Sequence, residues 1–139
     1  MSATLQPPFL VVRPGTSFWV ETCAPDACVA TRQAFQEGCY EAAWGYDAAG
    51  YEWPINGATL NAPLTFLQRV LPWSRVAVTL HLGTPTKTDV AAVISRMADI
   101  LLSGNEFCEE LPEAPLALIS QIEKATSMAE LIQIARRYD

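Results

Sequence analysis

The sequence has few charged residues, one histidine and no cysteine spacing typical of a metal site. Charged residues make up 17% of the 139 residues, whereas roughly 25% is usual in soluble proteins. Apolar residues reach 50%, so the charged side chains are too few to cover the whole surface of a monomer. We therefore expect part of the surface to be buried against a protein partner or a second copy of the chain, for example in a homodimer.

Basic residues are scarce and spread out. The net charge is −6, and residues 1–60 carry two basic and six acidic side chains, residues 61–104 four and two, and residues 105–139 three and seven. Nucleic-acid binding needs a clustered basic face that neutralises phosphates, so we expect no nucleic-acid partner. An acidic protein of this kind is better matched to a basic protein surface.

Long hydrophobic runs are also missing. No run approaches the ~18–20 apolar residues that cross a bilayer, and the N-terminal segment has two prolines and no basic region, which argues against a signal peptide. We expect a cytoplasmic protein without membrane contact. The four cysteines should then be thiols, and because they contain no C-x-x-C pair we expect neither a metal nor a cofactor.

The residues that are present predict one α+β domain over residues 1–139, β-rich in residues 9–55 and α-rich in residues 63–139. Pro14-Gly15 separates two strand-like runs and predicts an N-terminal hairpin. Residues 24–37 fit a strand or a helix, and their β-branched and aromatic content favours a strand. With the aromatic hairpin described below, this predicts a five-strand antiparallel meander.

The second half of the chain predicts three helices and a strand besides one short helix over residues 64–71. Residues 75–82 alternate as a central strand, with the valines and leucines on one face. Thr86 and Asp89 resemble a capping box that begins one long amphipathic helix packed on the sheet. Residues 115–138 predict a C-terminal αα-hairpin, whose last helix begins at the capping box Ser127–Glu130.

An aromatic hairpin is the most informative local feature. Residues 40–55 contain five of the thirteen aromatic residues around the turn Asp47-Ala48-Ala49-Gly50. A four-residue loop at this turn would pair Tyr46 with Tyr51 and Trp44 with Trp53, which places all four rings on one face. That face is either a wall of the core or a platform for binding. If it is exposed anywhere, Tyr46 and Tyr51 beside the turn should be the exposed residues.

His81 is the single histidine, and its usual pKa lies near neutrality. It would act as a base only in a cleft beside a nucleophile such as Cys39 or a carboxylate, and packing against the sheet is the alternative. Glu106, Glu109, Glu110 and Glu113 form an acidic loop that is either solvated or a contact surface for a basic partner.

These observations contain no catalytic constellation, and we expect a protein that is not an enzyme. The favoured function is a soluble protein-interaction module, such as a small inhibitor, an immunity-type protein or an adaptor. The alternative is a small-molecule binding domain or enzyme with a pocket between the aromatic hairpin and the strand that carries His81. The candidate ligand- or partner-binding residues are Trp44, Tyr46, Tyr51, Trp53, Glu52 and His81.

Overall fold

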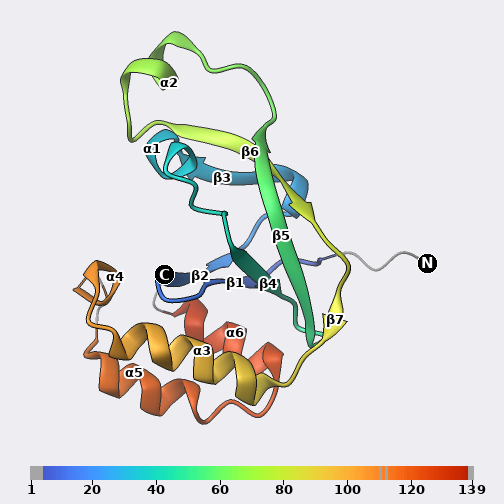
Figure 1. The fold of residues 1–139 in the computed structure, drawn as a ribbon, viewed down its shortest axis with the longest axis vertical. Coiled ribbons are helices and arrows are strands. Elements are labelled where there is room, and N and C mark those ends of the chain that lie inside the picture. The colour runs from blue at the N-terminus through green and yellow to red at the C-terminus, as the bar shows by residue number, and fades with distance from the viewer. Residues whose placement is uncertain (1–4, 110, 112, 138–139) are drawn as a thin grey trace.

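The computed structural model shows a bent antiparallel sheet with helices packed on one side (Figure 1). The structure describes residues 5–109, 111 and 113–137. The strands are β1 (Phe9–Arg13), β2 (Ser17–Glu21), β3 (Cys28–Thr31), β4 (Ala43–Tyr46), β5 (Tyr51–Leu60), β6 (Arg75–Leu82) and β7 (Thr86–Lys87). The helices are the 3-10 helix η1 (Pro25–Ala27), α1 (Arg32–Gln36), α2 (Phe66–Val70), α3 (Val90–Leu102), α4 (Glu106–Glu109), α5 (Pro115–Ile122) and α6 (Met128–Arg136). The α+β class is confirmed.

The strand order is β2-β1-β4-β5-β6-β3, with β7 beside β5. The N-terminal hairpin is confirmed, because β1 and β2 pair in antiparallel fashion from Phe9↔Glu21 to Arg13↔Ser17. The order is not consecutive, however: β4 lies next to β1, and β3 pairs with β6 at the other end of the sheet. The strand β6 covers the expected residues 75–82 and lies between two neighbours.

Residues 24–37 contain both a strand and a helix. Cys28–Thr31 is β3, and Arg32–Gln36 follows directly as α1. The Thr31 side chain accepts a hydrogen bond from the backbone N–H of Ala34 and so begins the helix. Gly38 follows at a φ of +75°, which a glycine adopts without strain and which ends a helix.

The aromatic hairpin forms at the expected turn but in a different register. Gly50 N donates to Asp47 O at 3.2 Å, and Gly50 has a φ of +92°. The Asp47 carboxylate accepts the N–H of Tyr51 at 3.0 Å. The pairing of β4 with β5 ends at Tyr46↔Glu52, so residues 47–51 separate the last paired positions. One extra loop residue moves every side chain of β5 to the other face.

The expected common aromatic face is therefore wrong. Gly45, not Trp44, lies opposite Trp53, while Trp44 lies opposite Pro54. Cross-strand partners share a face, so Tyr46 and Trp44 lie on the side of the helices, and Trp53 lies on the other side. Of the two residues expected to be exposed if any part of this face was, Tyr46 is fully buried and Tyr51 is 38% exposed.

Two hydrophobic cores lie on opposite sides of β1. Leu10 and Val12 pack against the helices, whereas Phe9 and Val11 face a second core inside the bend of the sheet, and all four are fully buried. The helix-side core also contains Phe18, Val20, Tyr46, Val93, Met97, Ile100, Leu101, Leu118, Ile122, Leu131 and Ile132. The sheet-side core also contains Leu5, Cys28, Tyr40, Ala43, Trp53, Ile55, Val76, Val78 and Leu80.

The helices α3, α5 and α6 form one layer on the β1–β2 side of the sheet (Figure 1). The expected long helix is α3, with 13 residues, but Asp89 is its N-cap and Thr86 belongs to β7. Pro115 begins α5, and the Ser127 side chain caps α6 by accepting from Glu130 N at 3.2 Å. Tyr138, the last residue of the expected αα-hairpin, lies outside the described residues.

Candidate interaction site

A short excursion between β5 and β6 carries four of the eight large apolar side chains that are exposed in the described part of the chain. We call residues 61–74, which include α2, the α2 arm. Figure 1 shows the α2 arm at one end of the long axis of the molecule and the layer of α3, α5 and α6 at the other. The exposed apolar residues of the arm are Phe66 (76% exposed), Leu67 (62%), Val70 (51%) and Trp73 (68%).

The α2 arm is held by a dense set of hydrogen bonds. Thr65 and Gln68 form a complete capping box, in which Thr65 N donates to Gln68 Oε1 at 2.9 Å and Gln68 N donates to Thr65 Oγ1 at 3.3 Å. Gln68 Nε2 also donates to the backbone oxygen of Arg75 at 3.0 Å. Three of the four exposed apolar side chains, Phe66, Leu67 and Val70, are therefore presented by an ordered turn of helix, and Trp73 lies in the turn that follows.

Further hydrogen bonds join the base of the arm to the body of the protein. Arg32 N donates to Ser74 O at 2.8 Å, and Gln33 N donates to Pro72 O at 3.0 Å, which ties the arm to the start of α1. Leu64 packs against the sheet-side core. Leu64 is partly buried there, whereas Phe66, Leu67 and Val70 of the following α2 are exposed.

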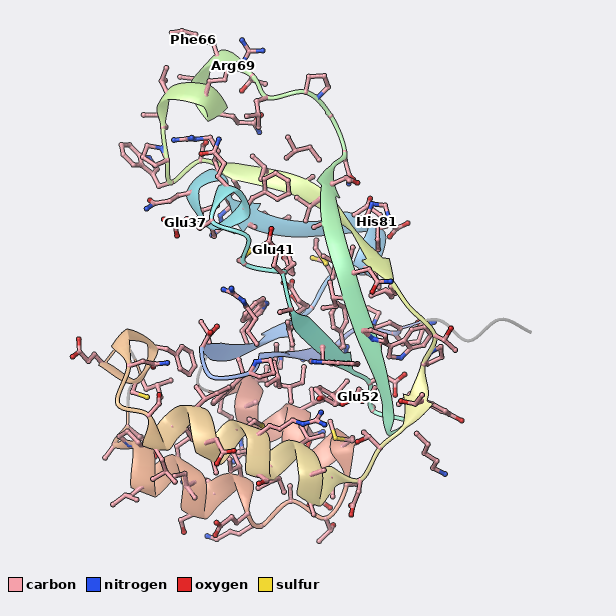
Figure 2. All side chains as sticks on the ribbon, viewed as in Figure 1. Glu37, Glu41, Glu52, Phe66, Arg69 and His81 are labelled. Carbon is pink, nitrogen blue, oxygen red and sulfur yellow. The ribbon has the colours of Figure 1, made fainter. Side chains whose placement is uncertain are left out.

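The charge around the arm differs from that of the rest of the chain. No aspartate or glutamate occurs between residues 53 and 88, and Arg69 is the single charged residue of the arm. Figure 2 shows Phe66 and Arg69 together on α2, away from Glu37 and Glu41 on the body. The exposed apolar surface is thus combined with a local positive charge in an otherwise acidic protein.

Two of the residues predicted from the sequence form a polar cluster that joins β5 to α3. Tyr46 Oη donates to Glu52 Oε1 at 2.7 Å, and Arg96 Nη1 donates to both Tyr46 Oη and Glu52 Oε1. Burial, followed by the hydrogen bond to Glu52, raises the pKa of Tyr46. The hydrogen bond to Glu52 raises the pKa of Arg96. The cluster keeps Arg96 charged and Tyr46 neutral, as expected of a structural link between sheet and helix.

The remaining predicted aromatic residues of the hairpin, Trp44, Tyr51 and Trp53, do not share one surface. Trp53 is 5% exposed, and its Nε1 donates to Asp47 Oδ2 at 3.0 Å. Trp44 is partly buried against the helix-side core. Tyr51 is 38% exposed at the loop, next to Lys87 of β7. The binding role expected for these aromatic residues stays a prediction.

His81 is exposed on the outer face of β6 (Figure 2). Its Nε2 lies 2.9 Å from Thr59 Oγ1 on β5. The neighbouring Leu80 and Leu82 pack on the opposite side, in and against the sheet-side core that contains Trp53. The structure therefore does not bring His81 and Trp53 to one surface.

A cavity of about 390 Å³ lies beside Trp53 and Leu82. Leu5, Pro7, Ala24 and Pro25 contribute apolar atoms to its wall, and Asp26 and Gln6 contribute polar ones. Of the six residues predicted to bind a ligand or partner, Trp53 lines this cavity. Two larger depressions, of about 990 and 650 Å³, adjoin along β2 and share Trp19, Thr31 and Ala34.

The cysteines and the acidic loop show no reactive arrangement in the described part of the chain. Burial raises the pKa of Cys39 to about 11 and that of Cys28 to about 12, so both are thiols at neutral pH. Among the residues that the structure describes, no group of three or more His, Cys, Asp or Glu side chains could hold a metal ion. Glu109 and Glu113 of the expected acidic loop are exposed, whereas Glu110 lies outside the described residues.

The sequence contained one indirect signal for the α2 arm. The sequence predicted the short helix but not its exposure. Leu64, Leu67 and Leu71 have the spacing of an ordinary buried helix face. That one signal was the lack of acidic residues around the arm.

Comparison with protein-family models, curated proteins and solved structures gives no significant match. None of the helices within the described ranges has the length and apolar character required to span a bilayer.

Proposed function

We propose that this protein is a non-enzymatic protein-interaction module that binds its partner through the α2 arm. The observation that carries the proposal is the exposure of Phe66, Leu67 and Val70 on α2 and of Trp73 in the turn that follows it. Exposed apolar side chains gathered in one place are typical of protein contact surfaces, and aromatic residues dominate the binding energy of such surfaces. A small cytoplasmic inhibitor, immunity-type protein or adaptor has these properties.

The acidic surface supports a role in the approach of the partner. The net charge of −6 attracts a protein with a basic surface over a distance of about 10 Å at moderate salt. The α2 arm itself holds a single arginine as its charge, so the contact at the arm is apolar. Salt should therefore slow binding without abolishing a complex formed through the arm.

A pull-down from the lysate of the source cell tests this proposal. The tagged wild-type protein, Phe66→Ser and the matched control Leu116→Ser are compared at low and moderate salt and analysed by mass spectrometry. Leu116 is 71% exposed on α5, on the helical layer, so its change removes a similar apolar area elsewhere. We expect one stoichiometric partner with the wild type and the control, and at least tenfold less with Phe66→Ser. Equal recovery in all three would refute the arm as the contact surface.

A second candidate is a small-molecule binding domain that uses the cavity beside Trp53. The observation in favour is that this cavity, about 390 Å³ in volume, is lined by Trp53 of the aromatic hairpin and Leu82 of the strand that carries His81. Its largely apolar wall suits an apolar or aromatic ligand. A metabolite screen that follows tryptophan fluorescence tests it, with Trp53→Phe as the variant that should lose the signal. Indifference to every compound would exclude this candidate.

A further inference from the structure

We propose that the α2 arm pairs with the α2 arm of a second copy of this chain around a twofold axis. The proposal rests on the proposed function of the arm as a contact surface, and it assigns that surface to a second acidic copy in place of the basic partner considered above. Three features of the arm support it: the area of its apolar surface, its charge and its order.

The exposed apolar area matches what a small symmetric dimer requires. Aromatic side chains bury ~150–250 Å² each when covered, and Phe66 and Trp73 are 76% and 68% exposed. With Leu67 and Val70, the arm offers roughly 500 Å². If all of this area were covered, a pair of arms would remove at most about 1,000 Å² from water, which is the lower limit for a specific interface. In a twofold pair the same patch lies on both sides, so an apolar patch is its own complement.

The charge distribution favours contact at the arm over contact anywhere else on two identical molecules. Two copies that each carry a net charge of −6 repel one another. Residues 53–88 contain no acidic side chain, whereas residues 105–139 contain seven acidic and three basic ones. Figure 1 shows the arm and the C-terminal helices at opposite ends of the long axis. Contact between two arms keeps the acidic C-terminal regions far apart.

The arm is already ordered before it meets a partner. The capping box of Thr65 and Gln68 and the two backbone bonds from Arg32 and Gln33 hold it in the monomer. Binding through a preformed surface costs less conformational entropy than binding through a segment that must first fold. A modest apolar area is therefore sufficient for reversible association.

Analytical ultracentrifugation of the purified chain tests the proposal. The chain has a mass of 15.2 kDa, and we expect the wild type to sediment with twice that mass in the micromolar range. Val70→Asp places a charge among the exposed apolar residues of α2, and Trp73→Ser removes the largest exposed side chain of the arm. Both side chains are exposed, so both variants should keep the fold, as circular dichroism would verify. Both should sediment as monomers, and Leu116→Ser should remain a dimer.

The salt dependence separates this dimer from an electrostatic complex. Raising NaCl from ~0.05 to ~0.5 M shortens the screening length and weakens the repulsion between the acidic bodies. The dissociation constant of the dimer should therefore fall several-fold as the salt concentration rises. A dimer that salt dissociates would overturn the proposal, because its contact would be electrostatic.

Three other results would also overturn it. A wild type that is monomeric throughout, yet captures a different protein through Phe66, would leave the proposed function in place and exclude pairing of the arms. Monomers that sediment with lipid vesicles of mixed neutral and anionic composition, and that lose this with Trp73→Ser, would assign the arm to a membrane surface. A dimer that Leu116→Ser disrupts as strongly as Val70→Asp would place the interface elsewhere.

Discussion

At the scale of single residues, buried polar groups of the aromatic hairpin are matched one to one. Asp47 is 6% exposed, and its two carboxylate oxygens accept the Tyr51 backbone N–H and the Trp53 indole N–H, each at 3.0 Å. A buried carboxylate without such donors would be costly. Asp47 therefore determines both the shape of the turn and the position of Trp53 in the sheet-side core.

Replacing Asp47 with alanine should lower the free energy of unfolding by about 1–3 kcal/mol, because two buried donors lose their acceptor. Asp47→Asn, which keeps one acceptor oxygen, should lose less. Urea unfolding followed by tryptophan fluorescence measures this. Asp99→Ala is the control, since Asp99 is exposed on α3, and it should change stability by less than about 0.5 kcal/mol. Equal stability of the Asp47 and Asp99 variants would contradict the role given to Asp47.

At the scale of elements, short side chains at the ends of helices decide where each helix begins. Asp89 Oδ1 accepts the N–H of Ala91 at 3.2 Å and begins α3, whereas Thr86 pairs with Glu52 in the short strand β7. Both residues fit the sequence pattern for a helix start. The pairing of β7 with β5 removes Thr86 from the helix, so the cap falls to Asp89.

Asp89→Ala should lower the free energy of unfolding by about 1 kcal/mol, the usual cost of removing an N-cap. Thr86→Ala should change it by less than about 0.5 kcal/mol, because Thr86 is exposed and away from the helix. Thermal or urea unfolding followed by circular dichroism compares the two variants. A larger loss from Thr86→Ala would restore the capping role that the sequence assigns to Thr86.

At the scale of the whole molecule, the two cores are joined through β1 and contain ionisable groups that burial keeps neutral. Burial raises the pKa of Cys28, Cys39 and Tyr40 on or beside the sheet-side core and of Tyr46 in the helix-side core. Each group therefore binds its proton more tightly in the folded chain than in the unfolded one. Their combined effect on stability is a property of the complete fold.

Stability should consequently fall as the pH rises above about 9, where the thiols and then the tyrosines of the unfolded chain lose their protons while the folded chain retains them. The contribution is fully present below the unfolded pKa of each group and is lost as pH rises toward its folded pKa. Urea midpoints at pH values from about 8 to 11, in the presence of a reducing agent, measure the slope. Tyr46→Phe should flatten that slope above about pH 10. A constant midpoint over this range would contradict the buried state of these groups.

Much of the local structure could be predicted from the sequence. The strand at residues 75–82, the start of α5 at Pro115, the cap of α6 at Ser127 and the turn at Asp47–Gly50 all follow from residue types and spacing. Each depends on interactions between residues a few positions apart, which the sequence order itself brings together. The class of the fold follows from these elements.

The candidate site could not be predicted in the same way. The division of Trp44 and Trp53 between two faces depends on one extra loop residue, and the exposure of Phe66 and Trp73 depends on the absence, among the described residues, of another element over α2. The sequence by itself determined the local elements, their caps and the acidic balance of charge. The tertiary structure alone decided the strand order, the two cores and the exposed arm, because burial depends on contacts between residues far apart in the chain.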